Sequence, residues 1–313
     1  MSDRWFKQKN HSSTKHLTTK SRLQLHQSIK LLEDVLPVGR KMLKEIPSDP
    51  FTEPMFIKVN ILERHINRIE VIIPLLKQWE KSPFVEDSIG LIIRGCLSDV
   101  ISQFYIEDVH SKVKSCPSPE EDEYLKIVYS LLTDHIHSGL RHIKSLTDAG
   151  VFTREESKKH IDSWKSRYKH YFKTEAVNYD NPTKNILPKQ YPSASHIIKL
   201  IRNSDLLKKF DLDQLYMGYF FYSKYEHFGA TTNSLQNTDM NMLFYIMMDS
   251  LSYILLSCQL LSIHFEEANY KYHRQFNSDC KLDAEGSEKI FAIREEFLRI
   301  VNTNRPAEYL DPI

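Results

Sequence analysis

Two short segments place ionisable side chains inside otherwise apolar helical patterns. The first is Leu91–Asp99, in which Arg94 lies among isoleucine and leucine side chains. The second is Tyr222–Phe228, in which Glu226 and His227 follow a run of tyrosine and phenylalanine. Because a charge on a buried helix face is costly unless it is paired, these groups are either structural ion pairs or parts of a site.

Two interpretations of Arg94 remain open. Its guanidinium group either projects into a pocket and binds an anion such as phosphate, or pairs with a carboxylate of a neighbouring helix. Asp99 lies five positions later and is displaced around the helix, so it can serve Arg94 only in part. We therefore expect Glu226 to be the distant partner, with Arg94 and the 222–227 segment in neighbouring helices of one bundle.

His227 lies near the end of a predicted helix, just before Gly229. The helix dipole favours a cation there, and a histidine at a loop edge can transfer protons near neutral pH. The structural alternative is a histidine hydrogen-bonded in the helix seam. The candidate catalytic residues are Arg94 and His227, and the candidate binding residues are Asp99, Tyr222, Ser223 and Glu226.

The rest of the chain repeats a helical period between proline and glycine breaks, without useful β alternation. The pattern predicts an all-α fold, a multi-helix bundle with long antiparallel helices. The expected helices cover about 21–46, 56–79, 87–114, 118–148, 153–172, 194–203, 214–227, 243–276 and 286–301. Thr153 and Glu156 have the spacing of a capping box, and Gly150 is a helix stop.

The expected domain organisation is a flexible basic tail over 1–20 and one helical domain over 21–313. The proline-rich loop 173–193 should be exposed and irregular or mobile. The apolar stretch 243–265 is interrupted by Asp249, several serines and His264, so it predicts a core helix packed on 91–104 rather than a membrane span.

Composition limits the chemistry. The net charge is +1, and the four cysteines contain no C-x-x-C pair, which argues against a zinc ribbon and a disulfide framework. There is no H-E-x-x-H, P-loop or paired Glu-x-x-His motif. We therefore predict no metal, no cofactor and no membrane partner, and a cytoplasmic location.

The segments SIGLIIRGCLSDVISQFYI and YFFYSKYEHFGATT, followed by a long apolar helix, resemble uncharacterised bacterial helical proteins related to HEPN-like bundles. That group includes ribonuclease toxins, antiphage abortive-infection proteins and inactive scaffolds. The resemblance covers roughly 55–115 and 210–275, and Asp99 stands where the group more often has glutamate. The catalytic Arg-to-His spacing of HEPN nucleases occurs as Arg4…His11 and Arg154…His160, in a basic tail and on a charged helix face.

Two functions are predicted as alternatives. One is a cytoplasmic binding or scaffold protein, in a bacterial defence or toxin system, whose partner is RNA, another protein or a second copy of the chain. The other, implied by the HEPN resemblance, is an RNA-cleaving enzyme in which Arg94 holds a phosphate and His227 transfers protons.

Overall fold

The structure is a computed structural model of an all-helical chain. It describes residues 16–45, 53–79, 81–82, 85–115, 120–173, 177–186, 191–205, 207–208, 210–223, 239–276, 284–303 and 305. The helices in these ranges are α1 (Thr19–Glu45), α2 (Glu53–Gln78), α3 (Val85–Ser115), α4 (Glu120–Asp148), α5 (Arg154–Arg167), α6 (Ala194–Ile201), α7 (Leu212–Ser223), α9 (Met240–Phe276) and α10 (Glu285–Asn302). The all-α prediction is confirmed, with an isolated bridge between Phe172 and Ile186 as the sole β pairing in these ranges.

The chain divides into two compact units, which are described separately. The bundle unit comprises 1–105 and 197–313, and the hairpin unit comprises 106–196. The sequence assigns 21–313 to one domain. That assignment stays a prediction, because compactness alone does not show that either unit folds by itself.

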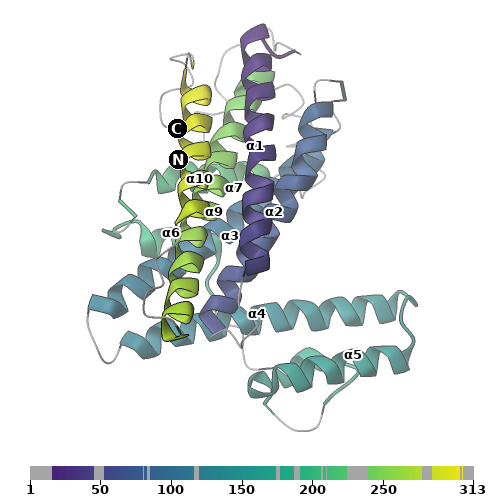
Figure 1. The fold of residues 1–313 in the computed structure, drawn as a ribbon. Helices are drawn as coiled ribbons and strands as arrows, with labels where there is room; N and C mark the ends of the chain where they lie inside the picture. The colour runs from purple at the N-terminus through teal and green to yellow at the C-terminus, as the bar shows by residue number, and fades with distance from the viewer. Residues whose placement is uncertain are drawn as a thin grey trace. The chain divides into compact units, whose positions relative to one another are not determined.

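In the bundle unit α1 packs against α2, α9 and α10, and α9 packs against α10, α2 and α7 (Figure 1). Side-chain contacts give the helix directions. The Ser21 hydroxyl donates to Asn241, so the first turns of α1 and α9 lie together. Lys41 near the end of α1 lies 3.6 Å from Glu285 at the start of α10, so these two helices are antiparallel.

The core of the bundle unit follows from the helical period of its apolar residues. Buried side chains recur on one stripe of α1, and α9 is apolar around most of its surface. The residues of α9 with no exposed area are Phe244, Met248, Leu251, Ile254, Leu255, Ser257, Cys258, Leu261 and Ser262. The prediction that 243–265 forms a core helix is confirmed.

The last residues of the predicted tail, 17–20, belong to the described structure. Leu17 is buried, and the Thr18 backbone amide donates to the Asn241 side chain at 3.1 Å. α1 begins at Thr19. Within the predicted tail, therefore, Leu17 is buried, Thr18 contacts the start of α9, and Thr19 and Lys20 already belong to α1. Residues 1–15 lie outside the described part of the chain.

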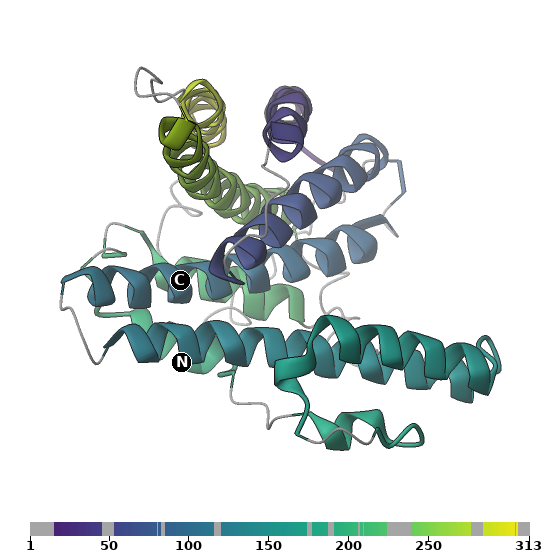
Figure 2. The ribbon, with the colours of Figure 1, turned by 60° about the horizontal axis from the view of Figure 1, so that its bottom comes forward.

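The hairpin unit is built on α4 and α5, which lie side by side in both ribbon views (Figures 1 and 2). Gly150 has a φ of 74° and ends α4, as its position predicts. Thr153 and Glu156 form the predicted capping box. α5 ends earlier than predicted, at Arg167, and a 3-10 turn, η1 (Lys169–Tyr171), continues the chain.

The predicted irregular loop 173–193 is only partly irregular. Its described portion contains a 3-10 turn, η2 (Pro182–Asn185), which contacts α4. Ile186 is 1% exposed, and Pro182 is also buried. The prediction of an exposed loop is wrong at these two positions, because η2 packs against α4 and Ile186 forms a backbone bridge with Phe172.

Two helical segments of the described chain, Val85–Lys112 and Met240–Lys271, are long and apolar enough to cross a membrane by length and composition. However, 56% and 67% of their most apolar windows are buried inside the fold. Core helices of a folded protein meet the same criterion.

Candidate functional site

Arg94 contacts an aromatic ring of a neighbouring helix. The central carbon of its guanidinium group lies 5.5 Å from the centroid of the Tyr219 ring, on α7. A guanidinium over a ring face is held by a cation–π interaction. The prediction that Arg94 and the segment containing Tyr222 lie in neighbouring helices is consistent with this contact, since Tyr219 and Tyr222 both lie in the described part of α7, Leu212–Ser223.

Asp99 is bound by two arginines of α2. Its carboxylate oxygens lie 3.0 Å from the Arg64 guanidinium and 2.6 Å from that of Arg68, and its side chain is only 14% exposed. Burial raises the pKa of the Asp99 carboxyl, and the two positive charges oppose that rise. Gly95 leaves room for this pairing, because a Cβ there would lie 3.2 Å from the Arg68 guanidinium. Asp99 thus joins α3 to α2.

The remaining candidate residues divide between described and undescribed parts of the chain. Tyr222 is buried, and burial raises the pKa of its hydroxyl well above the usual value. The Ser223 hydroxyl donates to the Phe220 carbonyl oxygen at 2.6 Å, a local helix contact. Glu226 and His227 lie outside the described residues, so the Arg94–Glu226 pair stays a prediction.

A buried polar triad, which the sequence analysis did not single out, connects three helices of the bundle unit. His65 of α2, Ser257 of α9 and Gln103 of α3 are each at most 1% exposed. His65 Nε2 lies 2.8 Å from the Ser257 hydroxyl, which in turn donates to the Gln103 side-chain oxygen. These bonds confirm that α3 and α9 meet in the core.

The tautomer of the histidine follows the orientation of the Gln103 amide. With the Gln103 oxygen accepting the Ser257 proton, Ser257 accepts from His65 Nε2–H, and His65 Nδ1 carries no proton. That nitrogen has no hydrogen-bond partner within the described chain. Burial lowers the pKa of His65 to about 3, and the charges of Arg68 and Arg64 contribute to the decrease. The histidine is neutral at physiological pH.

Serine beside histidine has the residue types of a nucleophile and its base. Here the Ser257 proton points to Gln103 rather than to His65, and all three side chains are sealed in the core. The arrangement fixes the positions of three helices and offers no exposed nucleophile. Cys96 and Cys258 are also fully buried, and burial raises the pKa of the Cys96 thiol to about 12.

A second, largely buried ion pair joins Asp249 of α9 to Arg305, after α10. Both oxygens of Asp249 accept hydrogen bonds from Arg305, at 2.8 and 2.7 Å, and Gln214 of α7 donates to the same carboxylate at 2.9 Å. The Arg305 guanidinium also lies over the Tyr245 ring. This cluster ties α7, α9 and the segment after α10 together.

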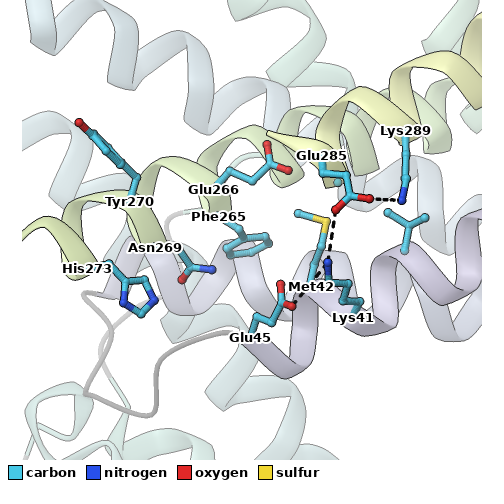
Figure 3. Close-up of a pocket in the computed structure, with 12 residues that line it drawn as sticks. Lys41, Met42, Glu45, Phe265, Glu266, Asn269, Tyr270, His273, Glu285 and Lys289 are labelled. Carbon is cyan, nitrogen blue, oxygen red and sulfur yellow. Dashed lines mark hydrogen bonds and ion pairs between the residues drawn. The ribbon is translucent and has the colours of Figure 1, made fainter. Parts of the chain in front are cut away.

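A groove of 440 Å³ lies between α1, α9 and α10 (Figure 3). Met42 and Phe265 form part of its apolar lining. Figure 3 shows Lys41 between Glu45 and Glu285, at 3.8 and 3.6 Å, and Lys289 also pairs with Glu285. The charged side chains on the rim of the groove therefore form ion pairs with one another.

Glu266 in the same groove caps a helix. Its carboxylate accepts the backbone N–H of Ser287 at 2.7 Å and the hydroxyl of the same residue, in the first turn of α10. A carboxylate at a helix N-terminus is favoured by the unpaired amides and the dipole. Glu266 therefore has a structural role. The described residues contain no cluster of three metal-ligating side chains.

The sequence contained partial signals for the residues it missed. Arg64 and Arg68 are four apart, so they share one face of the predicted helix 56–79. His65 stands beside Ile66 in an apolar run, as Arg94 does in its own helix. Nothing local indicates that Arg305 pairs with Asp249.

No family model matches the chain, and no curated protein or solved structure is significantly similar to it.

Proposed function

We propose that this chain is a helical binding protein, in which the bundle unit is a scaffold rather than a catalytic centre. The observation that carries the proposal is the pairing of Asp99 with Arg64 and Arg68. The acidic residue of the candidate site is used to hold two helices together. The buried triad and the Asp249–Arg305 pair use their polar groups in the same way.

The proposal includes the expectations drawn from the resemblance. These are a HEPN-like bundle core, a cytoplasmic location and a role in a bacterial defence or toxin system. The partner is RNA, another protein or a second copy of the chain. Scaffolds without catalysis occur within the group that the two segments resemble.

One observation favours the second candidate function, RNA cleavage by Arg94 and His227. Arg94 contacts Tyr219, and His227 follows eight positions later in the chain. A helix that continued to His227 would carry it about 12 Å along the axis from Tyr219, so this function requires the chain after Ser223 to turn back towards the guanidinium group. An arginine that binds the phosphate and a histidine that transfers protons are the two roles that this phosphodiester chemistry needs.

Induced expression in a bacterial host separates the two functions. For a binding protein we expect intact total RNA in cells that express the wild type, Arg94→Met or His227→Ala. The amount of soluble protein must be equal in all three strains. RNA cleavage by the wild type that both substitutions abolish would overturn the scaffold proposal and establish the enzyme.

A further inference from the structure

The hairpin unit carries a concentration of positive charge on α5 and the turn that follows it. From Arg154 to Lys173 the chain has seven lysines and arginines but three acidic residues, a net charge of +4 against +1 for the whole chain. The seven cations are Arg154, Lys158, Lys159, Lys165, Arg167, Lys169 and Lys173. All are exposed except Lys165, which is half-buried.

Two of the three carboxylates in this segment have local structural partners. Glu156 accepts the Thr153 backbone N–H at 2.8 Å in the capping box. Asp162 accepts the Tyr179 hydroxyl at 2.8 Å. These carboxylates hold the start of α5 and the following loop, and the segment still has a net charge of +4 when they are counted, so the field above it is positive.

Four of the cations follow one side of the helix. Arg154, Lys158 and Lys165 are separated by four and seven positions, which places them on one stripe of α5. Lys169 follows four positions later, at the start of η1. From Arg154 to Lys165 the stripe extends over about 16 Å at the rise of an α-helix.

An exposed aromatic ring lies beside this stripe. The Tyr179 side chain is 38% exposed, and the Lys158 ammonium lies 5.4 Å from the centroid of its ring. Its hydroxyl is held by Asp162, which fixes the ring against α5. A fixed, exposed ring next to a row of cations offers a stacking surface for a base.

Further aromatic rings stabilise the helix pair beneath the stripe. The Trp164 ring lies 5.4 Å from that of His135 and 5.5 Å from that of Tyr168. Gly139 of α4 makes this packing possible, because a Cβ there would overlap the Trp164 indole. The cations of the stripe therefore lie on a helix that packs against α4, not on an isolated helix.

We propose that the α5 surface, defined as Arg154, Lys158, Lys165, Lys169 and Tyr179, binds single-stranded RNA. Cations that follow a phosphate backbone together with aromatic rings that stack on bases are the combination that single-strand binders use. Stacking needs unpaired bases, which RNA presents in loops and ends. This inference rests on the proposed binding function and names its partner.

The first test measures the contribution of the cations. Fluorescence anisotropy of a labelled single-stranded oligouridine is followed with the full-length protein over a range of salt concentrations. We expect Lys158→Gln/Lys165→Gln to weaken binding at least tenfold. The slope of log K against log salt should become shallower by about 1.4, since each lost phosphate contact on a single strand contributes about 0.7.

The matched control removes two lysines from the bundle unit. Lys30 and Lys44 are exposed on α1, and Lys30→Gln/Lys44→Gln has the same change in net charge. This variant should bind with less than a twofold change and an unchanged salt slope. Equal effects of both double variants, or none from the α5 variant, would overturn the proposal.

The second test measures how much the Tyr179 ring contributes to binding. Tyr179→Ala should weaken oligouridine binding about tenfold, within the range found for loss of one base-stacking contact, whereas Tyr179→Phe keeps the ring and should bind nearly as the wild type does. Circular dichroism and the midpoint of thermal unfolding confirm that each variant is folded. Tyr179→Phe lacks the bond to Asp162, so weak binding by both variants would contradict stacking.

Competitors decide the class of partner. A duplex RNA of the same length, oligothymidine and polyglutamate should each compete at least tenfold less well than oligouridine. Equal competition by duplex RNA or by polyglutamate would show a purely electrostatic surface, and equal competition by oligothymidine would remove the preference for RNA. Each result overturns the inference but leaves the scaffold proposal standing, because that proposal is tested by RNA integrity in cells.

Discussion

Replacing Arg305 with methionine is expected to lower the free energy of unfolding by about 3–5 kcal/mol at neutral pH. The Arg305 side chain is 12% exposed and donates two hydrogen bonds to the Asp249 carboxylate, which is itself 17% exposed. Methionine keeps an unbranched apolar chain but leaves the Asp249 charge buried without its cation. Denaturant unfolding of the full-length protein, followed by circular dichroism, measures the loss.

The pH dependence of this loss has a definite sign. Burial raises the pKa of the Asp249 carboxyl, whereas the hydrogen bonds and charge of Arg305 lower it. Without Arg305 the folded-state pKa rises further above the unfolded value, so protonation of Asp249 stabilises the variant as pH falls. The difference between wild type and Arg305→Met should therefore shrink from pH 7 towards about pH 4. A loss that is constant with pH would show that Arg305 acts through packing alone.

An exposed pair provides the matched control. Arg202 pairs with Asp213, but the two side chains are 51% and 61% exposed. Arg202→Met should cost less than about 1 kcal/mol, because water solvates the remaining charge. A double variant, Asp249→Asn/Arg305→Met, should cost less than the sum of its single changes, since the two groups act together.

The helices could be predicted because their signals are local. Gly150 provides the backbone freedom for a positive φ, and Thr153 with Glu156 caps the next helix. Apolar residues at helical spacing then decide which side of each helix is buried. None of these signals depends on how the helices pack, which is why element positions agree within a few residues apart from the early end of α5.

The polar contacts depend on packing, and the sequence predicted them poorly. The partners of Asp99, Arg64 and Arg68, lie on the preceding helix and were not singled out. Arg94 is predicted to pair with Glu226, which lies outside the described residues, so that pairing stays a prediction; one described contact of Arg94 is the Tyr219 ring. A charged residue in an apolar run indicates that an interaction partner exists. Which residue that is depends on which helix packs against it and on which turn of that helix lies opposite the charge.

Composition misled the prediction at the start of the chain. The first 20 residues average as basic and polar, so they were predicted to be a flexible tail. One apolar side chain, Leu17, and one capping contact, Thr18 with Asn241, attach the end of that segment to the fold. An average over 20 residues cannot show that its last few residues contact the folded chain when two of them decide it.

His65 is expected to make the protein sensitive to acid. Its folded-state pKa is lowered from 6.5 to about 3 by burial and by Arg68 and Arg64, so only the unfolded chain takes up its proton between these values. A lowered pKa for a histidine means that its contribution to stability is complete above pH 6.5 and is lost as pH falls. The loss should approach about 1.4 kcal/mol for each pH unit in this window.

His65→Gln removes this titrating group but keeps an amide that can reach Ser257. At pH 7 the variant should be less stable than the wild type, because the packing of the triad changes. As pH falls from about 6.5 to 4, the difference between the two free energies of unfolding should shrink by roughly 3.5 kcal/mol, the product of that slope and the pH interval. Carboxylates common to both proteins cancel in the difference.

Ser257→Ala separates the titration from the hydrogen bond. This variant loses the contact to His65 Nε2, so it should be destabilised by about 1–3 kcal/mol through an unsatisfied buried donor. His65 remains buried beside Arg68, so the stability of Ser257→Ala should fall with pH in parallel with the wild type. If instead Ser257→Ala lost the acid sensitivity and His65→Gln kept it, the proton uptake would belong to another group. The neutral buried histidine would then not be the cause.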